Sequence, residues 1–328
     1  MGLENCERIL LTGAGFTYNF GGFLAREMWG RILNNPEVQL RPSLVSLLKQ
    51  DQHLNFESVY NAVMYGGHSK EDQKAMHAAT KEAYKNLDER VQQSPVNRNA
   101  IGKLLECFAS TGKARGYIFT LNQDIFVERW HLGVNKVLNT PGIPAKHISP
   151  FNNNRLDELP IYQVPSEDEM AVIRSQYEQE HSANYLYYVK LHGSMNWRTK
   201  SNQDVMVIGR EKLQQIHSKA ILDWYLHLFT EVFSHSNRRL LVIGYGFGDP
   251  HINGVLAKSA HEGRLKLCVI CPSDQETFRD TLLRDNDVDK AILWERITCY
   301  CDKTLNEVYP HDGGNTVFSR EVNEFLYG

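Results

Sequence analysis

The sequence lacks the features that mark several classes of protein. In 328 residues it has no apolar run long enough to span a bilayer, and Glu4, Glu7 and Arg8 stand where a signal peptide would be apolar. The chain also has no large excess of charge of one sign, because the formal net charge is -3 and the pI is near 6.5. We therefore expect a cytoplasmic protein that neither enters a membrane nor binds nucleic acid directly.

Cysteine is sparse as well, with six in the chain. Cys268-x-x-Cys271 and Cys299-x-Cys301 have spacings that could supply four thiolates to zinc. Cys268 and Cys271, however, belong to a run that is expected to be a buried strand, in which residues three apart point to opposite faces. We therefore predict no metal site and six reduced cysteines, as is usual in the cytoplasm.

Strand-like and helix-like segments alternate along most of the chain. Strands are expected at residues 8–11, 117–119, 134–138, 186–191, 240–243, 265–270 and 292–300, and helices at residues 21–33, 211–233 and 250–261. This alternation is typical of parallel strands joined by crossover helices, so we predict an α/β fold with a Rossmann-like open parallel sheet. Residues 141–169 are the longest loop-like stretch, which we expect near the mouth of a site.

One long segment interrupts the alternation. Residues 43–108 are almost all helical in their spacing, and residues 70–90 are too rich in Lys, Glu, Gln and Ala for a strand. We therefore predict one Rossmann-like catalytic domain from residues 1–35 and 111–328. Residues 36–110 would form a helical insertion or cap within it.

Four short motifs place glycine or small polar residues directly after strand-like runs. In chain order they are Gly13-Ala14-Gly15-Phe16-Thr17, Thr120-Leu121-Asn122-Gln123-Asp124, Leu191-His192-Gly193-Ser194 and Gly244-Tyr245-Gly246-Phe247-Gly248-Asp249. The carboxyl ends of parallel strands meet at one edge of an open sheet. A single crevice could therefore hold all four motifs.

The first motif suits a nucleotide phosphate. Glycines between a strand and a helix let backbone N–H groups approach a pyrophosphate. Tyr18 stands where the dinucleotide fingerprint has a third glycine, and no clear acidic residue ends a second strand about 20 residues later. A hydride-transferring dehydrogenase is therefore disfavoured, and a tight turn without a ligand fits this motif equally well.

The second and third motifs supply groups that could do chemistry. Asn122 offers a carboxamide, Asp124 a carboxylate and His192 an imidazole. These groups suit binding an amide, orienting water and accepting a proton from a hydroxyl. Taken singly, the Asn and the Asp are more often turn formers, and a histidine is more often a structural residue.

Together the four motifs resemble those of the sirtuin family. That family has a Gly-Ala-Gly-x-Ser turn, a Thr-Gln-Asn-x-Asp segment, a Leu-His-Gly segment and a Gly-Thr-Ser-type turn in this order. Leu-His-Gly-Ser-Met-Asn-Trp at 191–197 and Ile-Gly-Tyr-Gly-Phe-Gly-Asp-Pro-His-Ile at 243–252 are especially similar to bacterial sirtuin-like proteins of antiphage defence. The resemblance covers the sheet-forming majority of the chain but not residues 36–110.

The resemblance implies NAD as the ligand and a set of residues that bind it. The set is Gly13, Ala14, Gly15, Thr17, Asp124, Gly244, Tyr245 and Asp249. Ala14 and Gly15 match the backbone that faces the diphosphate, and Asp124 matches the residue that holds the carboxamide. Gly244 and Tyr245 fall where the family grips the adenosine half, whereas the last residue of the set has no assigned role.

The resemblance also implies two catalytic residues. Asn122 matches the residue beside the nicotinamide ribose, where it would position a water molecule, and His192 matches the general base.

Two departures from the protein deacylases of the family favour water over an acyl-lysine as the nucleophile. Deacylases have a Gly-Ile-Pro-x-Phe-Arg segment whose Phe shields the reactive ribose carbon, whereas residues 21–26 here read Gly-Gly-Phe-Leu-Ala-Arg. Deacylases also have a four-cysteine zinc module after the His-Gly segment, and no cysteine lies between Gly193 and Arg264. We therefore predict an NAD hydrolase that acts in antiphage defence by depleting NAD. A deacylase, a non-catalytic sensor of NAD or ADP-ribose and a structural subunit are the alternatives.

A defence NAD hydrolase that was always active would kill its host, so a control element is expected. The chain has no second-domain motif and no phosphate-binding Gly-Lys-Ser/Thr loop. The resemblance therefore implies a homo-oligomer and a separate partner, a HerA-like hexameric ATPase.

Overall fold

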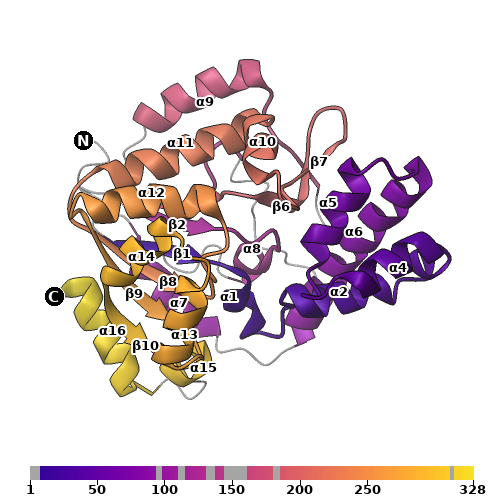
Figure 1. Ribbon diagram of the computed structural model, residues 1–328. Helices are drawn as coiled ribbons and strands as arrows, with labels where there is room; N and C mark the ends of the chain where they lie inside the picture. Colours follow the sequence, from indigo (N-terminus) through magenta and orange to yellow (C-terminus); the bar gives the residue numbers. More distant parts are fainter. Residues whose placement is uncertain are drawn as a thin grey trace.

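The fold is built on one parallel sheet. The computed structural model describes residues 8–93, 98–109, 115–130, 137–143, 161–179, 185–310 and 314–328. In these residues seven strands pair in the order β10-β9-β8-β1-β2-β5-β3, and every pairing is parallel. Helices cover both faces of this sheet (Figure 1). The predicted α/β, Rossmann-like open parallel sheet is thereby confirmed.

The order of the strands creates a crevice beside β1. The seven strands are β1 (Arg8–Thr12), β2 (Gly116–Thr120), β3 (Val137–Asn139), β5 (Tyr185–Lys190), β8 (Arg238–Ile243), β9 (Leu265–Ile270) and β10 (Ile297–Cys301). Strands β2, β3 and β5 lie on one side of β1, whereas β8, β9 and β10 lie on the other. The connections leave in opposite directions at such a switch point, which is where open α/β sheets bind ligands.

Sixteen helices lie in the described parts of the chain. They are α1 (Ala14–Tyr18), α2 (Ala25–Leu33), α3 (Pro36–Gln39), α4 (Pro42–Gln50), α5 (Phe56–Tyr65), α6 (Lys70–Gln93), α7 (Arg98–Glu106), α8 (Phe126–Trp130), α9 (Glu167–Gln179), α10 (Lys212–His217), α11 (Ala220–Ser234), α12 (Pro250–His261), α13 (Gln275–Leu283), α14 (Val288–Glu295), α15 (Leu305–Val308) and α16 (Val317–Tyr327). None is long and apolar enough to cross a bilayer.

Alternating side chains of the strands build two apolar cores, one on each face of the sheet. Ile9 and Leu11 of β1 pack in the core that contains Phe229 of α11. Leu10, between them, packs in the opposite core with Phe16 of α1 and Met76 of α6. Successive residues of a strand point to opposite faces, so a strand covered on both faces is apolar throughout.

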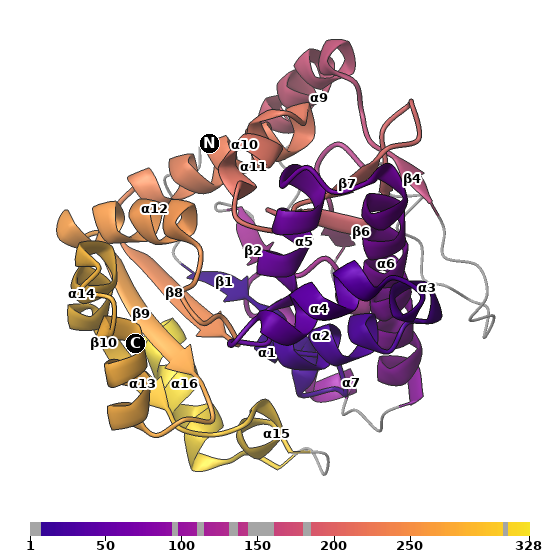
Figure 2. The ribbon, with the colours of Figure 1, turned by 45° about the vertical axis from the view of Figure 1, so that its right-hand side comes forward.

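Helices α4 to α7 occupy the segment whose spacing predicts helix. Figure 2 shows α2, α4, α5 and α6 gathered at one side of the sheet. Val63 and Met76 of this group lie in the same core as Ile118 of β2. The division of the chain into a catalytic domain and an insertion at 36–110 remains a prediction.

A second, smaller sheet, which the sequence did not predict, is formed mainly by the chain directly after β5. Its strands are β4 (Tyr162–Gln163), β6 (Gly193–Arg198) and β7 (Asp204–Met206), paired in the order β4-β6-β7. Gly193 has a φ of +73°, and a Cβ atom on it would lie 2.1 Å from the Val205 carbonyl oxygen. Only glycine fits there, so Gly193 lets the chain turn sharply after His192.

One predicted strand is partly wrong. Residues 292–300 were expected to be extended, but α14 continues to Glu295 and β10 begins only at Ile297. The Asp287 side chain accepts hydrogen bonds from the N–H groups of Asp289 and Lys290, which stabilises the start of this helix. A short apolar run inside a helix resembles a strand when periodicity is read alone.

Other boundaries also differ from the predictions. The helix expected at 211–233 is two helices, α10 and α11, and the one expected from residue 21 begins at Ala25. Strand β3 covers only the end of the strand expected at 134–138, whose first three residues lie outside the described chain. The loop expected at 141–169 already contains β4 and the start of α9, and its residues 144–160 lie outside the described chain.

Candidate functional site

A cavity of about 860 Å³ opens at the carboxyl ends of the parallel strands. Nine of the ten predicted site residues line it: Gly13, Ala14, Gly15, Asn122, Asp124, His192, Gly244, Tyr245 and Asp249. The tenth, Thr17, is buried and does not line the cavity, but it bonds two residues that do. The fold therefore brings the four motifs into one place.

Two glycine turns pack against each other at the cavity wall. The Gly15 N–H donates to the Gly244 carbonyl oxygen at 3.0 Å, and the Gly13 N–H donates to that of Ile243 at 3.0 Å. Gly244 has a φ of +66°, and a Cβ atom on it would lie 2.1 Å from the Phe16 nitrogen. This packing requires glycine and leaves bare backbone at the wall, which suits a diphosphate.

Asn122 is held in one orientation. Its Nδ2 atom donates to the Gly13 carbonyl oxygen at 2.9 Å and to the Thr17 hydroxyl oxygen at 3.0 Å. The Gly13 carbonyl can only accept a hydrogen bond, so the amide atom of Asn122 that faces it must be the nitrogen, which donates. Because both amide hydrogens are used, Oδ1 is the group that Asn122 can offer to a ligand or a water molecule.

Asp124 stabilises the orientation of Asn122 through Thr17. Its Oδ2 accepts a hydrogen bond from the Thr17 hydroxyl at 2.9 Å, and its Oδ1 accepts one from the Phe126 N–H at 3.0 Å. Burial raises the pKa of Asp124, while the nearby ammonium of Lys190 opposes the shift. Lys190 is itself fully buried and donates to the Asp124 carbonyl and, at 2.6 Å, to Glu128. Asp124 thus fixes Thr17, which fixes Asn122.

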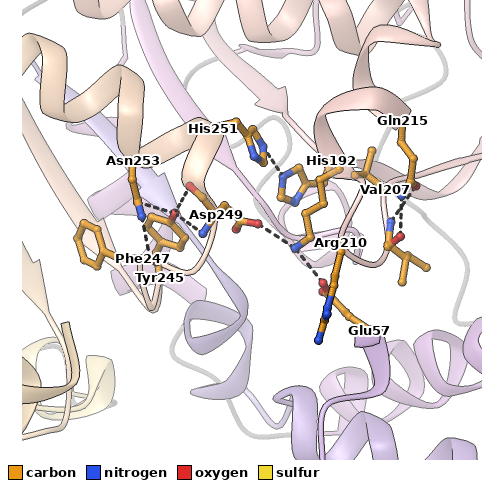
Figure 3. Close-up of polar contacts among 12 residues, drawn as sticks. Glu57, His192, Val207, Arg210, Gln215, Tyr245, Phe247, Asp249, His251 and Asn253 are labelled. Carbon is orange, nitrogen blue, oxygen red and sulfur yellow. Dashed lines mark hydrogen bonds and ion pairs between the residues drawn. The ribbon is translucent and has the colours of Figure 1, made fainter. Parts of the chain in front are cut away.

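His192 faces a second histidine. Its Nε2 lies 3.2 Å from Nε2 of His251, a residue of α12 (Figure 3). Burial lowers the pKa of His192 to about 3; Asp249 opposes this shift, and Lys212 and His251 add to it. The imidazole is therefore neutral at physiological pH, which is the form that can accept a proton.

Asp249 belongs to an ion-pair network that joins distant parts of the chain. The Lys212 ammonium lies 2.8 Å from Asp249 Oδ1 and 2.9 Å from Glu57 Oε2, as the dashed lines in Figure 3 mark. Burial alone would raise the pKa of Asp249, but its electrostatic interactions with His192 and Lys212 outweigh the effect of burial and lower the pKa. The network ties α5 to α10 and to the turn before α12.

Sequence reasoning missed three residues of this part of the site: Glu57, Lys212 and His251. His251 lies two residues after the fourth motif, within the sequence at 243–252 that is similar to the defence proteins, so that similarity could have indicated it. Glu57 and Lys212 carry no local signal, because they meet only when the helical segment packs on the sheet.

A metal ion has a possible donor set here. His192, Asp249 and His251 each offer one ligand atom, and the three atoms lie within 4.8 Å of one another. Two imidazoles and a carboxylate are ligands that zinc accepts. The Lys212 ion pair and the contact between the imidazoles, however, already give these side chains partners, and we assign no metal to them.

The cysteines lie away from this cluster. Cys268 packs in one apolar core, whereas Cys271 packs against the other. The Cys268 sulfur lies 2.7 Å from that of Cys299 on the neighbouring strand. The five cysteines in the described residues are free thiols, and Cys6 lies outside those residues.

The cavity continues past the fourth motif to the ends of β9 and β10. This part is lined by residues that the sequence did not predict to bind NAD, among them Cys271, Ser273, Phe278, Lys303 and Thr304. The Tyr245 hydroxyl closes the turn beside it by accepting from the Asp249 N–H at 3.1 Å and donating to Asn253 Oδ1 at 2.9 Å. The cavity thus extends across the carboxyl ends of both halves of the sheet, as a dinucleotide requires.

Apolar and aromatic side chains also line the cavity. Phe23, Leu24, Met28 and Tyr84 all line the cavity. Phe23 belongs to residues 21–26, the segment that departs from the deacylase pattern. This segment therefore also places an aromatic side chain at the cavity.

Comparison with known families gives one match. A family model described as a SIR2-like domain matches residues 118–290, which is more than half of the chain. The matched region includes the second, third and fourth motifs and leaves out the first glycine turn. A search of curated proteins finds no match.

Proposed function

The chain belongs to the SIR2-like family, and from this premise we propose that it hydrolyses the bond between nicotinamide and ribose in NAD. The products are nicotinamide and ADP-ribose. The observation that carries the proposal is that Asn122 Oδ1 and the neutral imidazole of His192 belong to the same cavity wall as two packed glycine turns.

The residues present fit NAD. The cavity volume of about 860 Å³ is within the range of pockets that hold ligands of this kind. The bare backbone of the glycine turns would face the diphosphate, and a side chain at Gly244 would force the two turns apart. Asp124, the residue proposed to anchor the carboxamide, lines the same cavity.

The chemistry needs few groups. Departure of nicotinamide leaves a ribose carbon with developing positive charge, so the site must hold the ribose and position one water molecule. Asn122 Oδ1 would accept a hydrogen bond from that water. As the new C–O bond forms, the electron pair of the broken C–N bond leaves with nicotinamide, and a water proton passes to His192.

The segment after His192 favours water over an acyl-lysine as the nucleophile. The chain turns at Gly193 into the small sheet, and β6 and β7 occupy the sequence position where deacylases have their zinc module. No feature of the described residues favours an acyl-peptide channel over a water molecule.

The activity is tested by measuring nicotinamide release from NAD by purified protein. Asn122→Ala and His192→Ala should each lower the rate by about 100-fold or more, the usual effect of removing a catalytic group. His227→Ala is the matched control, because His227 is exposed on α11. Activity retained in both site variants would refute the assignment, and NAD-dependent release of deacetylated peptide would favour a deacylase instead.

The biological role proposed is antiphage defence in the cytoplasm through depletion of NAD. Its support is the similarity of the third and fourth motifs to sirtuin-like defence proteins. The same similarity supports a homo-oligomer that is controlled by a HerA-like hexameric ATPase. Light scattering during size-exclusion chromatography, with and without such a partner, measures both assemblies.

A further inference from the structure

The contact between His192 and His251 limits what His192 can do in the site as it stands. A separation of 3.2 Å between the two Nε2 atoms is that of an N–H···N hydrogen bond. A neutral imidazole has one N–H and one lone pair in the ring plane. In either arrangement Nε2 of His192 is engaged, because it either carries the shared hydrogen or receives it from His251.

The proposed role of His192 as a base fixes the arrangement that matters for catalysis. A neutral imidazole accepts a proton at its bare nitrogen, so Nε2 of His192 can act as the base only when the ring hydrogen is on Nδ1. In that tautomer the N–H of His251 points at the Nε2 lone pair.

His251 is held in place by the turn of the fourth motif. It is the second residue of α12, whose first turn is closed by hydrogen bonds from the Ile252 and Asn253 N–H groups to the Asp249 carbonyl, both at 3.0 Å. The Asn253 side chain also donates to the Phe247 carbonyl at 2.8 Å. His192 lines the cavity, whereas His251 does not.

We propose that His251 is a positioning residue that masks the proton-accepting nitrogen of His192, so that His192 acts as a base only when the substrate or its water displaces this contact. The effect on turnover rests on the proposed NAD hydrolysis. Upon displacement the water O–H donates to His192 Nε2, the O–H bond breaks and an N–H bond forms. The oxygen keeps the electron pair and bonds the ribose carbon as nicotinamide leaves.

Without substrate, the contact with His251 therefore keeps the proton-accepting nitrogen of His192 occupied. Gly246 and Gly248 of the turn that carries His251 line the cavity, on the side proposed for the adenosine half. A bound dinucleotide would therefore contact the same turn that positions the masking histidine. Substrate binding and release of the base are coupled through that turn.

The kinetic test compares three variants of the full chain. His251→Phe keeps a ring but has no N–H, His251→Ala removes the ring, and His251→Gln keeps an N–H donor at similar reach. We expect kcat/KM for nicotinamide release to rise about fivefold in the first two, because one hydrogen bond contributes about 1 kcal/mol. The rise in kcat/KM should come from a lower KM. His251→Gln should behave like the wild type.

Two further measurements keep the outcomes distinct. In the His192→Ala background, His251→Ala should give no gain in the residual rate of nicotinamide release, which would place the gain on His192. A fall of kcat/KM in His251→Phe and His251→Ala would overturn the masking role. Turnover that depends on added zinc and is lost with a chelator would also overturn it, because the two histidines would then be metal ligands.

A readout without NAD separates this inference from the proposed function. In protein labelled with 15N-histidine, NMR reports whether His192 Nε2 accepts a hydrogen bond. We expect its resonance to move toward that of a free bare nitrogen in His251→Phe, and an unchanged resonance would overturn the contact. If wild-type protein releases no nicotinamide, the proposed function fails, and the NMR result still decides the masking contact.

Discussion

The Asn122 amide nitrogen lies 3.0 Å from the hydroxyl oxygen of Thr17, and this contact sets which atom Asn122 presents to the cavity. The same hydroxyl donates to Asp124 at 2.9 Å, so a single buried side chain connects the proposed water-positioning residue to the carboxylate behind it. Thr17 contributes to the site without lining it.

Thr17→Val should impair catalysis although its shape is nearly unchanged. Loss of the hydroxyl leaves Asp124 Oδ2 without its donor, and it leaves the Asn122 amide with one of its two hydrogen bonds, the one to the Gly13 carbonyl. We expect kcat for nicotinamide release to fall about tenfold, which corresponds to roughly 1.4 kcal/mol. Steady-state kinetics measure it, and Thr17→Ser, which restores the hydroxyl, should recover most of the activity. Equal rates in wild type and Thr17→Val would contradict the role of this contact.

Lys212→Met should weaken the attachment of the helical segment to the sheet. It leaves the carboxylates of Asp249 and Glu57 without their shared partner in a largely buried place. We expect the free energy of unfolding to fall by about 2 kcal/mol, less than for a fully buried pair because Glu57 is partly exposed. Urea denaturation measures the loss, with Lys200→Met as control, because the Lys200–Glu169 pair is exposed. Identical midpoints for wild type and Lys212→Met would show that the network contributes nothing.

The stability of the protein should fall as the solution becomes acidic, through His192. Its pKa is about 3 when folded and 6.5 in its ordinary state, so below about pH 6.5 the unfolded chain binds a proton that the folded chain does not. The contribution of His192 to the free energy of unfolding therefore has its full value above this pH and decreases as the pH falls toward 3. At pH 5.5 the loss is about 1 kcal/mol. Thermal unfolding of wild type and His192→Gln from pH 7.5 to 5.5 measures it, and parallel pH profiles would refute it.

Gly244→Ala and Gly246→Ala should differ although both residues line the cavity. A Cβ atom at Gly244 would lie 2.1 Å from the Phe16 nitrogen on backbone with positive φ, whereas one at Gly246 meets nothing within 4 Å. We expect Gly244→Ala to lose about 3 kcal/mol or more of stability, or to fail to fold, and Gly246→Ala to lose less than about 1 kcal/mol. Differential scanning calorimetry of both variants is the check. A similar loss in both would show that the two glycine turns do not require their close packing.

Much of the fold was predictable because strand signals are local. The apolar runs at 117–119, 186–191, 240–243 and 265–270 all proved to be strands of the parallel sheet. The failures have local causes too. The run at 292–300 combines the end of a helix with a strand, and periodicity over so few residues cannot separate them.

The sequence by itself determined which groups reach the carboxyl edge of the sheet. Each motif comes directly after its strand, and parallel strands end at the same edge, so Asn122, Asp124 and His192 had to meet the glycine turns. Only the tertiary structure decided how those groups are held. The contacts of His192 with His251, and of Lys212 with Glu57 and Asp249, join segments far apart in the chain. Their geometry depends on how helices pack on the sheet, which no local periodicity encodes.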